Sequence, residues 1–149
     1  MFYILALLVI VMDQLSKTLI RFNFNIGETL EVWDGVLNFT RYENSGASFS
    51  SFQGYGRLFV PIAAIIVVFV LYYRRKFKIK RFTMEMGSAL LVGGAIGNAI
   101  DRVLFNQVTD FIEFQSGHGI LNLADMAINV GIIFVLIDVL FFQRDKEKQ

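Results

Sequence analysis

The stretch from residue 58 to residue 81 reads LFVPIAAIIVVFVLYYRRKFKIKR, and it decides the class of fold. Its first 16 residues carry no charge, and six of its last eight are basic. A membrane-spanning helix needs about 20 mostly apolar residues. Basic residues gather in the loops on the cytoplasmic side of a membrane. The stretch therefore predicts a spanning helix that is followed by a cytoplasmic loop.

Three more apolar runs lie outside this stretch. Only 18% of the 149 residues are charged, whereas soluble domains carry about a quarter. We therefore expect one membrane-embedded domain over residues 1–149. The first run carries Asp13 and has no basic leader or small-residue cleavage site, so we interpret it as a retained span and not as a signal peptide. The expected spans are about 2–20, 58–73, 86–105 and 121–142.

The basic loop also predicts the orientation of the chain. With that loop in the cytoplasm, both termini are cytoplasmic, and the basic tail at 144–148 agrees. The loops at about 21–56 and 106–120 then face outside.

The first outer loop is rich in β-formers. TLEVW at 29–33 and VLNFTRY at 36–42 flank the turn pair Asp34-Gly35. We expect an all-α polytopic membrane protein of four transmembrane helices, with a small extracytoplasmic β-rich subdomain between the first two.

Composition excludes several kinds of site. The net charge of +1 provides no footprint for nucleic acid. There is no cysteine, so the sequence offers no thiol for catalysis or metal binding. His118 is the only histidine, which disfavours a histidine zinc site and a Ser-His-Asp triad. A site made from carboxylates alone is a weak metal candidate. We therefore expect no metal site.

Polar residues inside the apolar runs gather at one depth. An ionisable side chain at the centre of a spanning helix costs about 2.5–3.5 kcal/mol on insertion scales. In the predicted topology, three helices and one loop place such groups near the outer face, which predicts a functional site there. The positions are Asp13, Lys17, Asn98, Asp101, Arg102, Asp110, Asn122 and Asp125.

Some of these positions also have a structural interpretation. Asp13 and Lys17 stand in the favoured i,i+4 order of a helix ion pair. Gly93 and Gly97 have the G-x-x-x-G spacing of a close helix contact. Asp138 lies about 20 Å along the last span from the outer group, so we expect it to pair with a basic tail residue at the inner end.

Two acids from different elements, Asp110 and Asp125, can share one proton when they meet. The ionised acid then takes a proton from water while the protonated acid donates to a leaving amine, which is general acid–base peptide hydrolysis. One alternative is a Ser-Lys dyad between Lys17 and an outer-loop serine at 45, 48, 50 or 51. Another is a proton-coupled carrier that uses the same acids.

Five blocks in this order closely resemble the lipoprotein signal peptidases (signal peptidase II). They are DQLSK at 13–17, NSGASF at 44–49, GAIGNAIDR at 94–102, VTDF at 108–111 and NLADMAI at 122–128. One departure is Leu121, where the family usually has Phe.

The resemblance implies an aspartic endopeptidase of the bacterial inner membrane. It would remove signal peptides from diacylglyceryl-modified prolipoproteins, on the amino side of the lipidated cysteine, without a cofactor. The expected partners are these prolipoproteins, membrane lipids and globomycin-type peptide inhibitors, and the expected state is a monomer. The catalytic pair maps onto Asp110 and Asp125. The substrate-binding and supporting residues map onto Asp13, Lys17, Asn44, Gly46, Gly94, Asn98, Arg102, Asn122 and Ala124.

Overall fold

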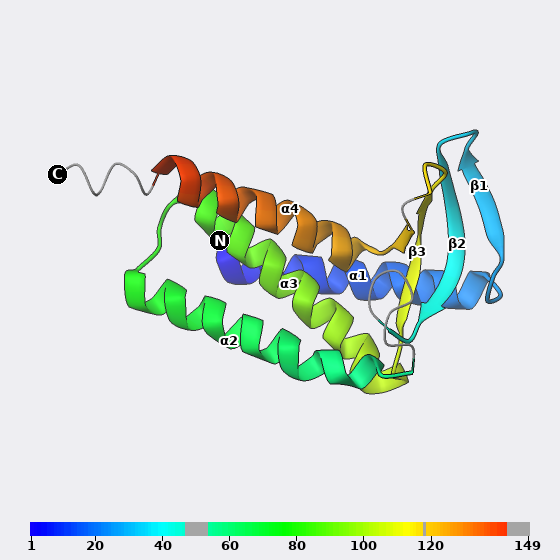
Figure 1. Ribbon diagram of the computed structural model, residues 1–149, viewed down its shortest axis with the longest axis horizontal. Helices are drawn as coiled ribbons and strands as arrows, with labels where there is room; N and C mark the ends of the chain where they lie inside the picture. The colour runs from blue at the N-terminus through cyan, green and yellow to red at the C-terminus, as the bar shows by residue number, and fades with distance from the viewer. Residues whose placement is uncertain (47–53, 118, 143–149) are drawn as a thin grey trace.

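The computed structural model describes residues 1–46, 54–117 and 119–142, and it contains four long apolar helices with a small sheet at one end (Figure 1). Each helix is long and apolar enough to cross a membrane. A 3₁₀ turn, η2, precedes the second helix, and a π-helical turn, η3, ends the fourth. The elements are α1 (Phe2–Asn23), η2 (Gly56–Leu58), α2 (Phe59–Phe77), α3 (Phe82–Phe105), α4 (Leu123–Ile137) and η3 (Asp138–Phe142).

The four predicted apolar helices are confirmed, but the second and third extend beyond the predicted spans where the two helices are linked. Helix α2 continues to Phe77, and α3 already begins at Phe82, so half of the predicted basic loop is helical. Basic side chains in the last turn of α2 face the negative end of the helix dipole. Lys78 ends the helix in the left-handed conformation, with φ of 46°.

The strands form one antiparallel sheet in the order β1 (Thr29–Trp33), β2 (Leu37–Asn44), β3 (Val108–Phe114), β4 (Ile120–Leu121). The predicted hairpin is confirmed, with Gly35 at φ of +69° in its turn. The link between α3 and α4 supplies β3 and β4, where the sequence predicted a loop up to residue 120 and the start of the last span at Leu121. Asp110 therefore lies on a strand. The sheet lies across one end of the helices, and the link from α2 to α3 lies at the other end (Figure 1).

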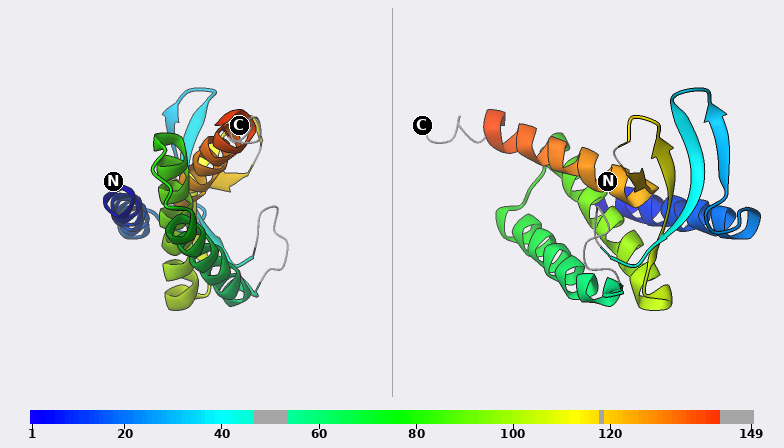
Figure 2. Two further views of the ribbon diagram at one scale, coloured as in Figure 1. Left: turned by 90° about the vertical axis from the view of Figure 1, so that its left-hand side faces the viewer. Right: turned by 45° about the vertical axis from the view of Figure 1, so that its right-hand side comes forward.

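Helix α3 packs against the other three helices and lies between α1 and α4 in the end-on view (Figure 2). Glycines permit the close approach. A Cβ at Gly93 would lie 2.8 Å from Val9 Cβ on α1, and a Cβ at Gly94 would lie 2.5 Å from the Ala124 carbonyl oxygen on α4. The predicted packing role of these glycines is confirmed, and the packing fixes the polar ends of three helices against one another.

The end of the bundle opposite the sheet has its own acid, Asp138, which is fully buried. Its carboxylate lies 2.8 Å from Arg81 Nη2 and accepts a 2.5 Å hydrogen bond from the Thr83 hydroxyl. Within the described residues, Asp138 therefore pairs with the start of α3, and the expected tail partner is not among these residues. The tail itself, residues 143–149, is outside the described residues.

Candidate active site

Asp110 and Asp125 lie close together at the end of the helix bundle where the sheet lies. Asp110 lies on β3 and is 3% exposed, whereas Asp125 lies half-buried in the first turn of α4. The chain brings them together because α4 begins directly after β4, which pairs with β3. The predicted pair is therefore assembled by a strand pairing that the sequence analysis did not anticipate.

Asn122 connects the two acids. Its Nδ2 donates a 2.6 Å hydrogen bond to Asp110 Oδ1, and its Oδ1 accepts a 2.9 Å bond from the Asp125 backbone N–H. The backbone N–H of Asn122 in turn donates to Asp125 Oδ2 at 3.3 Å. This reciprocal arrangement is a capping box at the start of α4. The helix cap therefore also sets the position of one acid relative to the other.

Two further side-chain amides donate hydrogen bonds to the carboxyl oxygens that Asn122 does not contact. Asn44 Nδ2 donates to Asp110 Oδ2 at 3.0 Å, and Asn98 Nδ2 donates to Asp125 Oδ1 at 2.7 Å. Asn44 is itself fixed because its Oδ1 accepts the Gly46 N–H at 3.1 Å. Neutral donors orient the carboxyls without adding positive charge beside them.

Burial and the neighbouring acid raise the pKa of Asp110 to about 7. Loss of hydration is the larger cause, and the charge of Asp125 adds to it. The hydrogen bonds from Asn44 and Asn122 act in the opposite direction, as does the charge of Lys17. Asp110 can therefore hold a proton close to neutral pH.

A second cluster, centred on Lys17, lies deeper between α1 and α3. Lys17 is fully buried, and its Nζ lies 2.8 Å from Asp13 Oδ2, 2.9 Å from Asn98 Oδ1 and 3.5 Å from Asp101 Oδ2. Asp13 Oδ1 accepts the Ala124 N–H at 2.9 Å, which ties this cluster to the start of α4. The Lys17 cluster thus joins α1, α3 and α4 beside the two acids.

The Lys17 cluster bears on the Ser-Lys alternative. The three ammonium donors of Lys17 face two carboxylates and an amide oxygen. The hydroxyl of Ser45 accepts the Gly54 N–H at 3.1 Å. Serines 48, 50 and 51 lie outside the described residues, as does His118. In the described part of the chain, Lys17 is an ion-pair partner and does not face a serine as a base.

Arg102, Gly94 and Ala124 complete the predicted set. Arg102 is half-buried, its Nη2 lies 3.4 Å from the Gly46 carbonyl oxygen, and its guanidinium lies 5.2 Å from the centroid of the Phe59 ring. Gly94 and Ala124 form the close contact between α3 and α4. All eleven predicted residues therefore lie at or next to the end of the bundle that carries the sheet.

Asp101 belonged to the polar residues predicted at this depth but was given no role in the site, and Arg21 and Thr109 were not predicted to take part. Asp101 is fully buried, pairs with Arg21 Nη2 at 2.7 Å and accepts the Thr109 N–H at 3.2 Å. Arg21 Nε also donates to Thr109 Oγ1 at 2.8 Å. One signal was present, because Arg21 continues the i,i+4 spacing of Asp13 and Lys17.

No group of three or more histidine, cysteine, aspartate or glutamate side chains within residues 1–46, 54–117 and 119–142 is arranged to hold a metal ion. The chemistry available at the site is that of two carboxyl groups, one of which holds its proton near neutral pH.

Comparisons with known proteins agree with this geometry. The family model for signal peptidase (SPase) II matches residues 5–141. The lipoprotein signal peptidase of Listeria monocytogenes serotype 4a is 36% identical over 141 residues, covering 93% of this chain and 92% of the relative. The lipoprotein signal peptidase of Listeria welshimeri serovar 6b has the same identity and coverage.

Two solved structures, each described as a bacterial membrane enzyme obtained by the in meso method, have the same fold. The 2.3 Å structure has a TM-score of 0.92 and 32% identity over 99% of this chain and 92% of that chain. The 1.9 Å structure has a TM-score of 0.87 and 33% identity over 95% and 93%.

Four long apolar helices together with this family match define a membrane-embedded aspartic peptidase. Within that class, the chain belongs to the signal peptidase II family, the lipoprotein signal peptidases.

Proposed function

We propose that this chain removes signal peptides from diacylglyceryl-modified prolipoproteins and cleaves on the amino side of the lipidated cysteine, with water activated between Asp110 and Asp125. The observation that carries the proposal is the Asn122 bridge, which holds the two carboxyls at one site by hydrogen bonds to both residues. Two carboxyl groups in different environments have different pKa values, so one can act as the acid and the other as the base.

In the proposed mechanism, Asp125 is the base and Asp110 is the acid. Asp125 is the more exposed of the two, so its carboxylate takes a proton from the attacking water. Asp110, with a pKa of about 7, donates its proton to the amine that leaves when the peptide C–N bond breaks. Each acid ends the cycle with its role reversed, and one proton transfer through water restores the resting state.

The other predicted residues are proposed to bind substrate or support the pair. Asn44 and Asn98 orient the carboxyls, and the Lys17 cluster fixes the helices that carry them. Arg102 provides a half-buried cation next to Gly46, where a substrate carbonyl oxygen can be bound.

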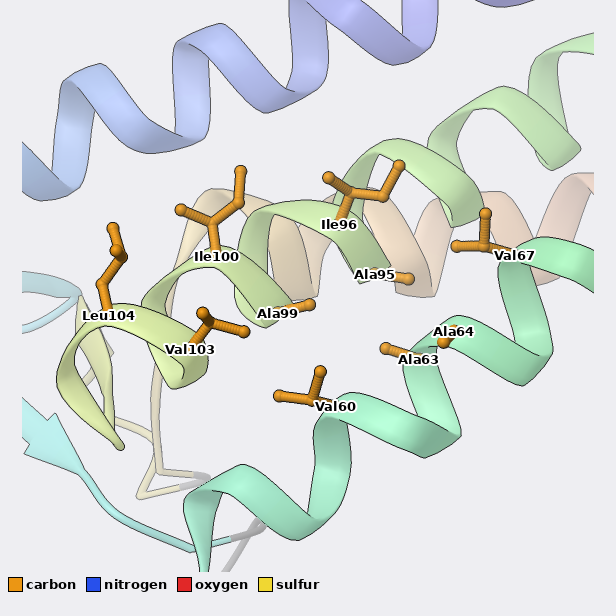
Figure 3. A pocket seen from close by; sticks show the side chains of 10 residues that line it. All are labelled: Val60, Ala63, Ala64, Val67, Ala95, Ile96, Ala99, Ile100, Val103 and Leu104. Atoms are coloured by element: carbon orange, nitrogen blue, oxygen red, sulfur yellow. The ribbon is translucent and has the colours of Figure 1, made fainter.

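An apolar groove between α2 and α3 suits the lipid part of such a substrate. Its volume is about 390 Å³, and its lining contains only aliphatic side chains, among them Val60, Ala99 and Val103 (Figure 3). These residues lie in the outer halves of the two helices, and Arg102 is adjacent in sequence to Val103. We propose that apolar chains of the substrate lie in this groove while the peptide reaches the acids.

The proposed topology places the acids toward the outer face of the bacterial inner membrane and both termini in the cytoplasm. The basic residues between 74 and 81 lie at the end of the bundle opposite the sheet, as the positive-inside rule requires. The enzyme is proposed to act as a monomer and to be inhibited by globomycin-type peptides.

The test replaces each acid by its amide. Asp110→Asn and Asp125→Asn are each expected to lower cleavage of a lipidated prolipoprotein in detergent by at least about 100-fold, the lower range for a general acid–base group. Asp34→Asn, in the exposed hairpin turn, is the matched control and should cleave normally. Thermal unfolding of each variant checks that it is folded. Near-normal turnover by either folded active-site variant would refute the proposal.

A further inference from the structure

The strand pair β2–β3 has a bulge beside Asp110. Phe39 pairs with Ile112, but the next recorded pair is Tyr42 with Asp110, so β2 carries one extra residue. An unbroken ladder from Phe39 would place Arg41 opposite Asp110, whereas the bulge places Tyr42 there. Bulges beside active sites re-aim side chains in this way.

The Arg41 side chain, which the bulge turns away from Asp110, binds other groups. Its Nη1 donates to the backbone carbonyls of Arg21 at 3.0 Å and Phe24 at 2.8 Å, at the outer end of α1. Its Nη2 lies 2.9 Å from Glu43 Oε1. The guanidinium is therefore held near α1, and an uncharged phenol takes the position across from Asp110.

Tyr42 shares a face of the sheet with Asp110. Residues that pair directly across antiparallel strands lie on the same face, with Cβ atoms about 4.5–5.5 Å apart. Asn44, two residues further along β2, lies on this face too. The Asn44 hydrogen bond to Asp110 confirms the orientation of that face. Tyr42 and Asn44 thus stand side by side on the face that carries the acid.

The hydroxyl of Tyr42 has no hydrogen-bond partner among the described residues, and the side chain is 37% exposed where Asp110 is 3% exposed. A tyrosine side chain is longer than that of aspartate by a ring, so from a neighbouring position it ends beyond the carboxyl. A peptide substrate that is positioned against the Asp110 carboxyl therefore passes the end of the Tyr42 side chain. A phenol is a neutral hydrogen-bond donor, and a peptide held between two acids presents carbonyl oxygens that need donors.

We propose that Tyr42 is a substrate-contacting residue: its hydroxyl donates a hydrogen bond to a peptide carbonyl of the prolipoprotein beside the cleaved bond, and its ring shields Asp110 from water. This inference rests on the proposed function of Asp110 and Asp125. It assigns separate tasks to the two parts of one side chain, so the two parts can be removed separately.

The experiment compares Tyr42→Phe, which removes only the hydroxyl, with Tyr42→Leu, which also removes the ring. Tyr3→Phe is the matched control, because Tyr3 is 73% exposed near the start of α1, at the end of the bundle opposite the sheet. The pH profile of kcat/KM is measured for each variant with a lipidated prolipoprotein, and thermal unfolding checks the fold. The charged groups that act on Asp110 are Asp125 and Lys17, with Arg102 also close enough to interact, and all three are kept in every variant.

Tyr42→Phe is expected to lower kcat/KM by about two- to tenfold, the worth of one neutral hydrogen bond, without moving the pH profile. Tyr42→Leu is expected to lower kcat/KM further. It should also move the alkaline limb of the kcat/KM profile to lower pH, because water that reaches Asp110 favours the ionised form of its carboxyl. Tyr3→Phe should match the unaltered enzyme.

The inference is overturned if Tyr42→Phe cleaves as fast as Tyr3→Phe, or if the pH profile of a folded Tyr42→Leu does not move. If Tyr42→Leu does not fold, the Tyr42→Phe comparison decides the question of the hydroxyl alone. Failure of the proposed function looks different, because there Asp110→Asn or Asp125→Asn would keep its turnover. Abolished cleavage in those two variants with normal Tyr42→Phe refutes only the inference about Tyr42.

Discussion

Replacement of Lys17 by methionine tests how the buried charges hold the helices together. Lys17 is fully buried and lies 2.8 Å from Asp13, 3.5 Å from Asp101 and 2.9 Å from the Asn98 amide oxygen. Lys17→Met keeps an unbranched, flexible side chain that is one atom shorter, and it removes the charge and the hydrogen-bond donors. Two buried carboxylates then lose a cation that they shared.

The expected loss in the free energy of unfolding depends on which partners each acid keeps after the substitution. Breaking a buried ion pair by removing one partner costs about 3–5 kcal/mol, because an uncompensated charge stays behind. Asp101 still pairs with Arg21 at 2.7 Å, and Asp13 still accepts the Ala124 N–H. We therefore expect Lys17→Met to lower the free energy of unfolding by about 3 kcal/mol, at the lower end of that range.

The assay is unfolding in mixed micelles with increasing sodium dodecyl sulfate, followed by circular dichroism. Lys80→Met, at an exposed lysine of the inner loop, is the control and should change the free energy of unfolding by less than about 0.5 kcal/mol. Adding Asp13→Asn to Lys17→Met should recover part of the loss, since it removes the acid left without its cation. A loss below about 1 kcal/mol for Lys17→Met, the value of an exposed pair, would refute the reasoning.

Three further predictions concern the acids and the contacts around them. Cleavage should fall as the pH rises through about 7, because Asp110 then loses the proton it donates; a pH–rate profile that stays flat from 6 to 9 would contradict this. The raised pKa of Asp110 also means that the folded state holds this proton more tightly than the unfolded state. The free energy of unfolding should therefore fall between about pH 4 and 7, and this part of the fall should be absent in Asp110→Asn, as chemical unfolding at each pH would measure. Gly94→Ala should lower the free energy of unfolding by about 1–3 kcal/mol, because the new Cβ would lie 2.5 Å from the Ala124 carbonyl oxygen; an unchanged midpoint in the micelle assay would show that α4 moves aside freely.

The sequence predicted the membrane fold well because its signals are local. Twenty apolar residues in a row have few alternatives to a spanning helix, and a turn pair between two β-rich runs predicts a hairpin. The expected apolar helices and the hairpin are both confirmed, with α2 and α3 extending further toward the link between them than predicted. Helix ends were less predictable because basic side chains suit the last turn of a helix as well as a loop.

The site was predicted as a set of residues but not as an arrangement. Depth along each span placed Asp13, Lys17 and Asn98 near Asp125, since only the rise per residue was needed. The pairing of Lys17 with Asp101 depends on how α1 rotates against α3, and no spacing within one helix reports that. The pairing of Asp138 with Arg81 was likewise not predicted, because Arg81 lies just before α3 and far from Asp138 in the chain.

The sequence by itself determined that this protein lies in the membrane, how many times it crosses, and which carboxyls lie at one depth. The physical reason is that apolar length, charge and helical rise are properties of single segments. Only the tertiary structure decided that β3 pairs with β2 and β4, that Asn122 links Asp110 to Asp125, and that a bulge sets Tyr42 across from Asp110. Register and helix rotation arise from contacts between segments far apart in the chain, and one inserted residue in a strand changes which side chain faces the acid.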